Sequence, residues 1–420
     1  MQLWLIPMIY VGAAVLAGLT LPRLEQAYLT AYTLSVSVSS AQAYLSAAAS
    51  GMMSLTGIVF AMAFVMVQFS AIAYSPRLVL WFARDPITFH ALGVFGASFV
   101  YALFTLAWVD RGGSGSVPLV SSLFVAIMIL YSLLLFSRLM QRLSDLQISN
   151  VLHAIGDQGR AIIRELFPPI SASAPAGDDA GGSALDDQAL GPAIQVLRYT
   201  GAPRTIATIN TVTLVHLAKR ANATIVMLSA VGDTLVHDTP ILRVHGAGPP
   251  LGDNELLKTI EVRRERTFEQ DPKYPIRLLV DIAIKALSPA INDPTTAVQT
   301  IDQIEDLLQR LGGSRLATGD IRDADGVLRL VMPMPSWEDY LTLSFDEIRI
   351  YGVMSVQVLR RMRSALVSLM ASPLPQARIE MIRTYLTHLD AAIAASPLDL
   401  HDQTMASQED RQGIGMSRRH

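Results

Sequence analysis

A long stretch without charge constrains this chain more than any other feature. No Asp, Glu, Lys or Arg occurs from Gln26 through Pro76, whereas the window from Asp253 to Lys273 is densely charged. Over the 420 residues, 51% are apolar and 16% are charged, a composition skewed away from that of an ordinary soluble enzyme. The sequence therefore predicts a membrane-embedded N-terminal part followed by a large soluble C-terminal part.

Four apolar segments are long enough to cross a bilayer, which takes roughly 20 helical residues. They are residues 3–21, 51–73, 89–109 and 117–136, and none contains Asp, Glu, Lys or Arg. We therefore expect an α-helical transmembrane bundle of about four spans over residues 1–137. No Lys or Arg precedes the first segment, so we interpret it as a retained helix rather than a cleaved signal peptide. The missing charges disfavour a proton relay or a charged-substrate transporter.

Residues 26–50 are uncharged but rich in Ser, Thr, Ala and Tyr. Three interpretations stay open: a helix on the bilayer surface, an extension of the second span, or a fifth span. Cytoplasmic loops concentrate Lys and Arg, which indicates the orientation. With four spans, one side of the membrane carries four arginines, Arg77, Arg84, Arg138 and Arg142. The other side carries only Arg23 and Arg111, and each of these two lies near an acidic residue. This predicts a multi-pass protein of the bacterial inner membrane with a cytoplasmic soluble half, and a fifth span would reverse that orientation.

The second span carries small and polar residues at helical spacing. Ser54, Gly57, Ala61, Val65 and Gln68 recur every three or four positions, which places them on one stripe. Small residues let helices approach closely, and a glutamine in lipid needs a partner or water. The stripe is either a seam between helices or the lining of a permeation path in a homo-oligomer.

The soluble half divides by composition into several parts and is of the α+β class. Residues 168–192 are mostly Pro, Ala, Gly, Ser and Asp, which is typical of a flexible linker. Short β-branched segments then predict strands, and apolar residues at helical spacing predict helices. The expected order is a helix leaving the membrane at 138–167, the linker at 168–192, a small β-rich module at 193–250, a mainly helical domain at 251–395 and a disordered tail at 396–420.

Three local patterns add detail to this half. Residues 255–268 are densely charged and predict an exposed helix. Asp325-Gly326 between β-branched flanks predicts a hairpin turn. Ser336 and Asp339 have the spacing of a capping box at a helix start.

The segment "ALSPAINDPTTAV" at 286–298 predicts a sharp corner between two helices. Asp293 before Pro294 is a strong helix start, with the carboxylate as N-cap and the proline in the first turn. Asn292 has no such assigned role. It either tolerates a left-handed backbone or offers its amide to a ligand or a neighbouring subunit. The candidate ligand or interface residues at the corner are Ser288, Asn292, Thr295 and Thr296.

A second candidate lies in "VRRERTFEQD", residues 262–271. Arg264 and Arg266 stand among several acids, which is typical of a solvated face with ion pairs. The alternative is a pocket in which these two arginines bind a small anion.

Other functional classes lack support in the sequence. The chain has no cysteine, which excludes disulfides and thiol chemistry, and its formal net charge of −3 gives no argument for nucleic-acid binding. Neither H-E-x-x-H nor G-x-S-x-G occurs, so we predict no metal site, no cofactor and no enzymatic activity. Two functions stay open: a homo-oligomeric, channel-like membrane protein with a cytoplasmic gating domain, or a membrane-anchored sensor or scaffold that binds a small anion or a protein.

The longer segments resemble the bacterial predicted membrane proteins of domain-of-unknown-function family 2254 (DUF2254). The matching pieces are "GMMSLTGIVFAMAFVMVQFSAIAYSPR", "FGASFVYALF", "RERTFEQDPKYPIRLLVDIAIKALSPAINDPTTAVQTIDQI" and "FDEIRIYG". The resemblance covers nearly the whole chain and implies a membrane-embedded N-terminal half with a soluble half behind it. It implies no activity or substrate. The segment "TGAPRTIATIN" departs from the strand opening usual in that family.

Overall fold

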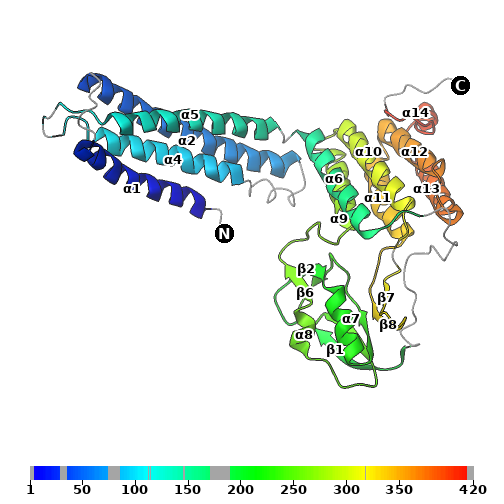
Figure 1. The fold of residues 1–420 in the computed structure, drawn as a ribbon. Coiled ribbons are helices and arrows are strands. Elements are labelled where there is room, and N and C mark those ends of the chain that lie inside the picture. The colour runs from blue at the N-terminus through cyan, green and yellow to red at the C-terminus, as the bar shows by residue number, and fades with distance from the viewer. Residues whose placement is uncertain are drawn as a thin grey trace. The chain divides into compact units, whose positions relative to one another are not determined.

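The computed structural model describes residues 4–28, 36–73, 86–111, 113, 115–144, 147–170, 190–316 and 318–413. The chain forms two compact units, Met1–Asn150 and Val151–His420 (Figure 1).

The first unit consists of long apolar helices, each sufficient in length and composition to cross a membrane. They are α1 (Leu5–Tyr28), α2 (Val38–Ala73), α4 (Pro86–Leu106) and α5 (Leu119–Ser144). Helix α4 packs against the other three and is the most buried of the four. Close approach depends on small residues: a methyl group added to Gly93 would lie 2.6 Å from the Tyr10 ring, and one added to Gly18 would lie 2.5 Å from Phe104 Cβ. The predicted transmembrane helical bundle is confirmed.

Residues 38–50 belong to α2, which has 36 residues without interruption. Of the three interpretations of residues 26–50, the structure therefore supports an extension of the second span for this part. Residues 26–28 complete α1, and residues 29–35 lie outside the described residues. Near its start, α2 is level with the start of α5, because the Tyr44 hydroxyl donates a hydrogen bond to the Ser122 carbonyl at 3.3 Å.

Charged residues gather at this same end of the bundle. The carboxylate of Glu25 accepts hydrogen bonds from the backbone N–H of Val120 at 2.6 Å and of Ser121 at 3.0 Å. A carboxylate there satisfies the unpaired amides of the α5 N-terminus and complements its dipole. Arg23 and Arg111 both lie over the ring of Trp108, at 5.5 and 4.1 Å from its centroid.

The second unit contains two sheets and a group of helices. The strands are β1 (Ala193–Arg198), β2 (Arg204–Ile209), β3 (Ala223–Met227), β4 (Thr234–Leu235), β5 (Pro240–Gly246), β6 (Ile260–Arg263), β7 (Asp320–Arg322) and β8 (Leu328–Val331). One sheet has the order β1-β5-β3-β8-β7 and the other β4-β2-β6. Helix α7 (Thr211–Arg220) packs on β3 and β8 and shares their apolar core.

The strands of the second unit extend beyond the predicted β-rich module at 193–250. Strand β8 pairs in parallel with β3, with Ile225 opposite Leu330, and β7 completes the same sheet. Parallel partners are joined through long connections, so the pairing leaves no local pattern in the sequence. The expected turn at Asp325-Gly326 is confirmed, because Gly326 has φ +78° and its N–H donates to the Asp323 carbonyl.

The predicted exposed helix at 255–268 is wrong. Helix α8 ends at Leu257, and residues 260–263 form β6, which pairs antiparallel with β2. Ile260 is buried in the sheet core while Glu261 is exposed. Tertiary pairing with β2 therefore overrides the local preference suggested by the charged residues.

The remaining helices form a separate packed group. They are α6 (Ile148–Leu166), α9 (Lys273–Ala286), α10 (Pro294–Gly312), α11 (Trp337–Gly352), α12 (Val356–Met370), α13 (Gln376–Ala394) and α14 (Leu400–Ala406). The predicted capping box at Ser336 and Asp339 is confirmed at the start of α11. The predicted linker at 168–192 begins as packed backbone, since Ile170 N–H donates to the Gly313 carbonyl. Its residues 171–189 lie outside the described part of the chain.

The tail after Ser396 also differs from the prediction of disorder. It forms α14, capped by Asp399, and residues as far as Gly413 are described. Asp410 reaches the guanidinium of Arg360 at 3.4 Å, and both side chains are almost fully buried. A buried carboxylate opposite a buried arginine fixes this segment on α12, a contact that composition alone does not reveal.

Candidate functional site

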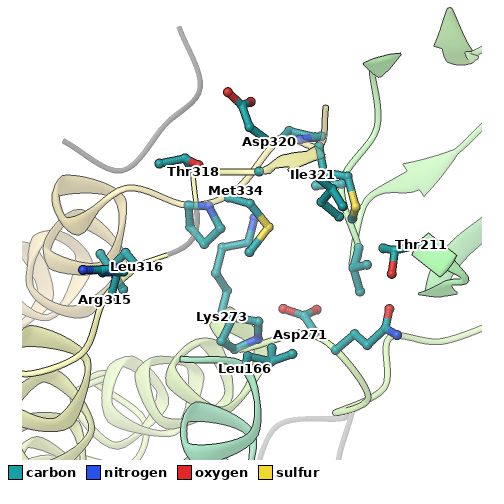
Figure 2. Close-up of a pocket in the computed structure, with 18 of the residues that line it drawn as sticks. Leu166, Thr211, Asp271, Lys273, Arg315, Leu316, Thr318, Asp320, Ile321 and Met334 are labelled. Atoms are coloured by element: carbon teal, nitrogen blue, oxygen red, sulfur yellow. The ribbon is translucent and has the colours of Figure 1, made fainter. Parts of the chain in front are cut away.

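A cavity of about 450 Å³ lies inside the second unit, between residues of the sheets and residues of the helices. Leu166, Asp271 and Lys273 line one side of it, and Thr318, Asp320 and Met334 line the opposite side (Figure 2). The walls also include apolar side chains: Val231, Leu316, Ile321, Met332, Pro333 and Pro335. A mostly apolar cavity with a few polar groups is the usual form of a small-molecule site.

Asp271 is the most deeply buried acid of this cavity, with 1% of its side chain exposed. It is paired with Arg266, whose Nη2 donates to Asp271 Oδ1 at 2.9 Å. The same guanidinium lies 5.3 Å from the ring centroid of Tyr274. Gly232 makes this arrangement possible, because it has φ +90° and a methyl group there would lie 2.5 Å from Asp271 Oδ2. The charge of Asp271 is therefore already neutralised.

Lys273, unlike Asp271, has no partner of opposite charge among the described residues. It begins α9 and makes no ion pair within the part of the chain that the structure describes. With Asp271 paired, the lining charges that remain are Lys273 and Arg315 against Asp320. This balance favours an anionic ligand, and an ammonium on a flexible stem can adjust to reach it.

The two arginines proposed from the sequence do not line this cavity. Arg264 is exposed, and Arg266 is committed to Asp271 and Tyr274. Sequence reasoning passed over Lys273 because one lysine in a charged window has no distinguishing pattern. Its position as the first residue after Pro272, at a helix start, was the available signal.

The corner at 286–298 has the predicted capping geometry. Asp293 accepts a hydrogen bond from Thr296 N–H at 3.1 Å and another from the Thr296 hydroxyl at 2.6 Å, and Pro294 opens α10. The Ser288 hydroxyl donates to the Lys285 carbonyl at 2.6 Å. The hydroxyls of Ser288 and Thr296 are thus engaged within the corner itself.

Asn292 and Thr295 are the two exposed members of the predicted cluster. Asn292 has φ +50°, the left-handed conformation that asparagine tolerates better than most residues. Asn292 therefore adopts the left-handed backbone conformation that was one of its two interpretations.

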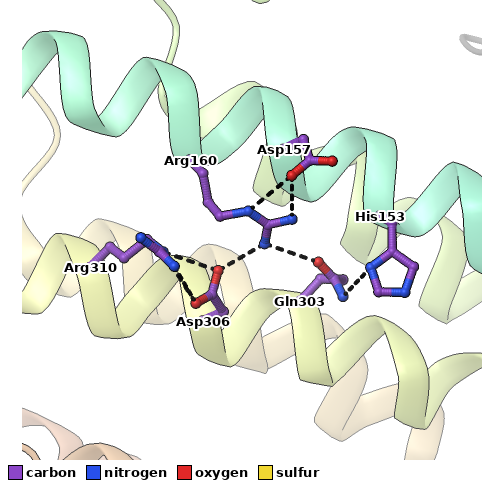
Figure 3. Close-up of polar contacts among 6 residues, drawn as sticks. All are labelled: His153, Asp157, Arg160, Gln303, Asp306 and Arg310. Atoms are coloured by element: carbon purple, nitrogen blue, oxygen red, sulfur yellow. Dashed lines mark hydrogen bonds and ion pairs between the residues drawn. The ribbon is translucent and has the colours of Figure 1, made fainter.

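A polar network joins α6 to α10 (Figure 3). Arg160 of α6 donates to Asp306 at 2.8 Å and to Gln303 at 3.2 Å, and Gln303 also contacts His153 at 3.3 Å. Burial alone would raise the pKa of Asp306, but hydrogen bonds from Arg310 and Arg160 outweigh it and hold that pKa below its usual value. The network fixes the register between these two helices.

Arg378 holds the other end of α10. Its Nη1 donates to the carbonyls of Leu311, Gly312 and Ser314 at 3.2, 2.7 and 2.9 Å, and the side chain is almost fully buried. These bonds satisfy carbonyls that a helix end leaves unpaired. They also fix the start of the segment that carries Arg315 and Leu316 into the cavity wall.

The chain thus combines four apolar helices long enough to span a membrane with an α+β unit that contains this cavity. The family model described as "Predicted membrane protein (DUF2254)" matches residues 1–368. The chain belongs to this family. Uncharacterized proteins of Mycobacterium bovis and Mycobacterium tuberculosis are each 26% identical to this DUF2254 chain over 365 residues, covering 84% of it and 68% of each relative. No solved structure matches it.

The membrane helices of this DUF2254 protein contain a polar pair that the sequence analysis missed. His90 lies within a predicted span, and its Nδ1 is 3.1 Å from the Tyr10 hydroxyl. The two rings also meet edge to face at 5.8 Å. The prediction against a proton relay rested on the absence of Asp, Glu, Lys and Arg, and His90 is a further ionisable group within that span.

The stripe on α2 lies on the outside of the helical bundle. Ser54, Gly57, Ala61, Val65 and Gln68 are all exposed, and no atom of the described residues outside the neighbouring turns of α2 lies within 4 Å of a methyl group added to Gly57. The stripe is therefore not a seam among the described helices of the same DUF2254 chain. Among the residues that the structure describes, no group of three or more His, Asp or Glu is placed to hold a metal ion.

Proposed function

We propose that this DUF2254 protein is a membrane-anchored sensor of the bacterial inner membrane. Its soluble unit faces the cytoplasm, and the cavity beside Lys273 binds a small organic anion. The observation that carries this proposal is a cavity of about 450 Å³ whose wall includes the ammonium group of Lys273, which makes no ion pair with the described residues. That volume lies within the roughly 300–1,000 Å³ common for ligand sites.

The chemistry of the lining narrows the ligand. Methionine, proline and aliphatic side chains supply most of the wall, so an apolar body would be buried there. Lys273 would then hold the anionic end. A carboxylate with a short apolar tail fits both features better than a compact inorganic anion does.

The cavity wall is also continuous in sequence with the membrane helices through α6. Leu166 and Pro168 line it at the end of this helix, whose first residue, Ile148, follows the last residue of α5 after a short connection. Along α6, Gly159 packs closely, because a methyl group there would lie 2.8 Å from Leu307. A ligand that moves the end of α6 would act on a rigid element continuous in sequence with the membrane helices.

Thermal unfolding of the full-length protein in detergent tests the proposal, with hexanoate and inorganic phosphate as the added anions. We expect hexanoate to raise the midpoint, since a ligand that binds the folded state stabilises it. Lys273→Met should abolish the increase, and Lys258→Met, at an exposed lysine, should preserve it. Equal responses from both variants, or no response from wild type, would contradict the proposal.

A second function is favoured by the stripe on α2. We propose that copies of the chain associate through Gly57 and Ala61, and that the resulting homo-oligomer borders a permeation path. The support is that these small residues are exposed on an apolar helix. Gly57→Leu should reduce the oligomer measured by mass photometry in nanodiscs. Gly12→Leu is the matched control, because Gly12 also has open space around it.

Ion flux through reconstituted vesicles separates association from permeation. Flux that Gly57→Leu removes and Gly12→Leu retains supports a path. An oligomer without flux leaves α2 as an assembly surface, and a monomer in nanodiscs rules out both.

A further inference from the structure

Two turns at one end of the second unit expose large apolar side chains. The α9–α10 corner exposes Ile291 to 37%, and the α11–α12 turn exposes Ile350, Tyr351 and Met354 to 59%, 56% and 59%. The turns are neighbours, since a methyl group added to Gly352 would lie 3.5 Å from Leu287 Cδ1. These four residues are called the apolar tip below. Exposure of these apolar side chains to water does not stabilise the fold of a soluble domain.

The direction of α6 shows which end of the unit carries the apolar tip. His153 contacts Gln303 and Arg160 contacts Asp306, so α6 and α10 run in the same direction (Figure 3). The start of α10 therefore lies at the same end as the start of α6. At 1.5 Å per residue, Pro294 is roughly 14 Å from Gln303 and Ile148 roughly 8 Å from His153, so the corner extends about 6 Å beyond the start of α6.

The connection between α5 and the start of α6 is short. Ser122 is level with the polar end of the bundle, and roughly 20 residues cross the hydrocarbon core, so α5 leaves it near residue 142. Helix α5 ends at Ser144 and α6 begins at Ile148. Four backbone steps span at most about 14 Å. This short connection limits how far the start of α6, and with it the end of the unit that bears the apolar tip, can lie from the end of α5.

We propose that the apolar tip inserts into the interfacial layer of the lipid bilayer and seats the soluble unit on it. Tyrosine is favoured at this depth, where its ring lies among lipid and its hydroxyl reaches water. The exposed polar residues of the corner, Asn292 and Thr295, suit the headgroup region beside it. Two acids close in sequence to these turns are engaged: Asp293 caps α10, and Asp346 is 3.8 Å from Arg349.

Spin labels in the full-length protein test this inference. The chain has no cysteine, so single-cysteine variants need no prior substitution. Met354→Cys places a label in the apolar tip. Val327→Cys is the matched control, because Val327 is 45% exposed and lies in the β7–β8 turn. Both proteins are reconstituted into vesicles of phosphatidylcholine and phosphatidylglycerol. Collisions with oxygen, which concentrates in lipid, are compared with collisions with a water-soluble nickel complex.

We expect the oxygen-to-nickel ratio to be severalfold higher for the label at 354 than for the label at 327. Adding Ile350→Asp to the Met354→Cys protein should lower that ratio toward the control value. A label at 354 as open to nickel as the control would overturn the inference. So would a label shielded from both reagents, which would show that a second copy or another part of the protein covers the apolar tip.

Discussion

The guanidinium of Arg266 is paired with the carboxylate of Asp271, which is almost completely shielded from water. Removing one partner of such a pair leaves an uncompensated buried charge. We expect Arg266→Ala to reduce the free energy of unfolding by about 2–3 kcal/mol. This is below the ~3–5 kcal/mol of a fully buried pair, because the arginine side chain remains 24% exposed.

Chemical denaturation of the full-length protein, followed by far-ultraviolet circular dichroism, measures this loss. Arg264→Ala is the control, since that side chain is exposed, and a change within about 0.5 kcal/mol is expected there. Equal losses from both variants would mean that the pair with Asp271 does not stabilise the fold.

The lowered pKa of Asp306 predicts how the stability of the protein depends on pH. Its pKa in the folded protein lies below the usual value near 3.9, so the ionised form is stabilised by folding. That stabilisation is complete above about pH 4 and is lost as the pH falls through the lower, folded-state pKa. Wild type should therefore be more stable than Asp306→Asn at pH 7, and the difference should shrink below about pH 4. A difference that stays constant down to acid unfolding would show that Asp306 does not titrate in this way.

Because α6 and α10 are in close contact, a larger side chain between them should reduce the stability of the fold. A methyl group at Gly159 would lie 2.8 Å from Leu307, so Gly159→Ala should reduce stability by about 1–3 kcal/mol. At Gly313, the nearest atom is 3.5 Å away and φ is −88°, so Gly313→Ala should be neutral or slightly stabilising. Thermal midpoints of the two proteins provide the comparison. A Gly159→Ala protein as stable as wild type would contradict the tight packing.

Substitutions of Asn292 can separate a role of its backbone conformation from a role of its side-chain amide in recognition. Its φ of +50° suits glycine, so Asn292→Gly should retain stability, whereas Asn292→Ala should lose about 1 kcal/mol. Asp293→Ala should lose about 1 kcal/mol through the missing cap. These losses are measured by denaturation. A glycine variant that loses as much as the alanine variant would indicate that the side-chain amide itself contributes.

The features predictable from the sequence were those with local causes. The spans follow from length and hydropathy, and the corner follows from Asp293 before Pro294. The strand β8 was not predictable as a partner of β3, because its pairing crosses about a hundred residues of chain. Likewise, β6 has the charges of an exposed helix, and only its pairing with β2 explains its conformation.

The candidate site was predictable only in part. Lys273 gains its significance from side chains contributed by α6, α7 and β7, which no local pattern joins. His90 is visible in the sequence, but the prediction for the spans depended only on Asp, Glu, Lys and Arg. Asp293 was identified correctly as a cap, whereas the neighbouring turn between α11 and α12 has no local pattern that links it to this corner.

The hydrogen bond between Tyr44 and Ser122 sets a depth scale for α2. If the hydrocarbon layer begins at that level, the next 20 residues or so cross it, and α2 reaches the far boundary near Phe64. Gly57 and Ala61 then lie within the acyl chains, while Gln68 lies about one turn beyond them. The amide of Gln68 can be hydrated there. The stripe therefore has one part within the hydrocarbon layer, suited to contact between helices, and one end in the hydrated interface of the membrane.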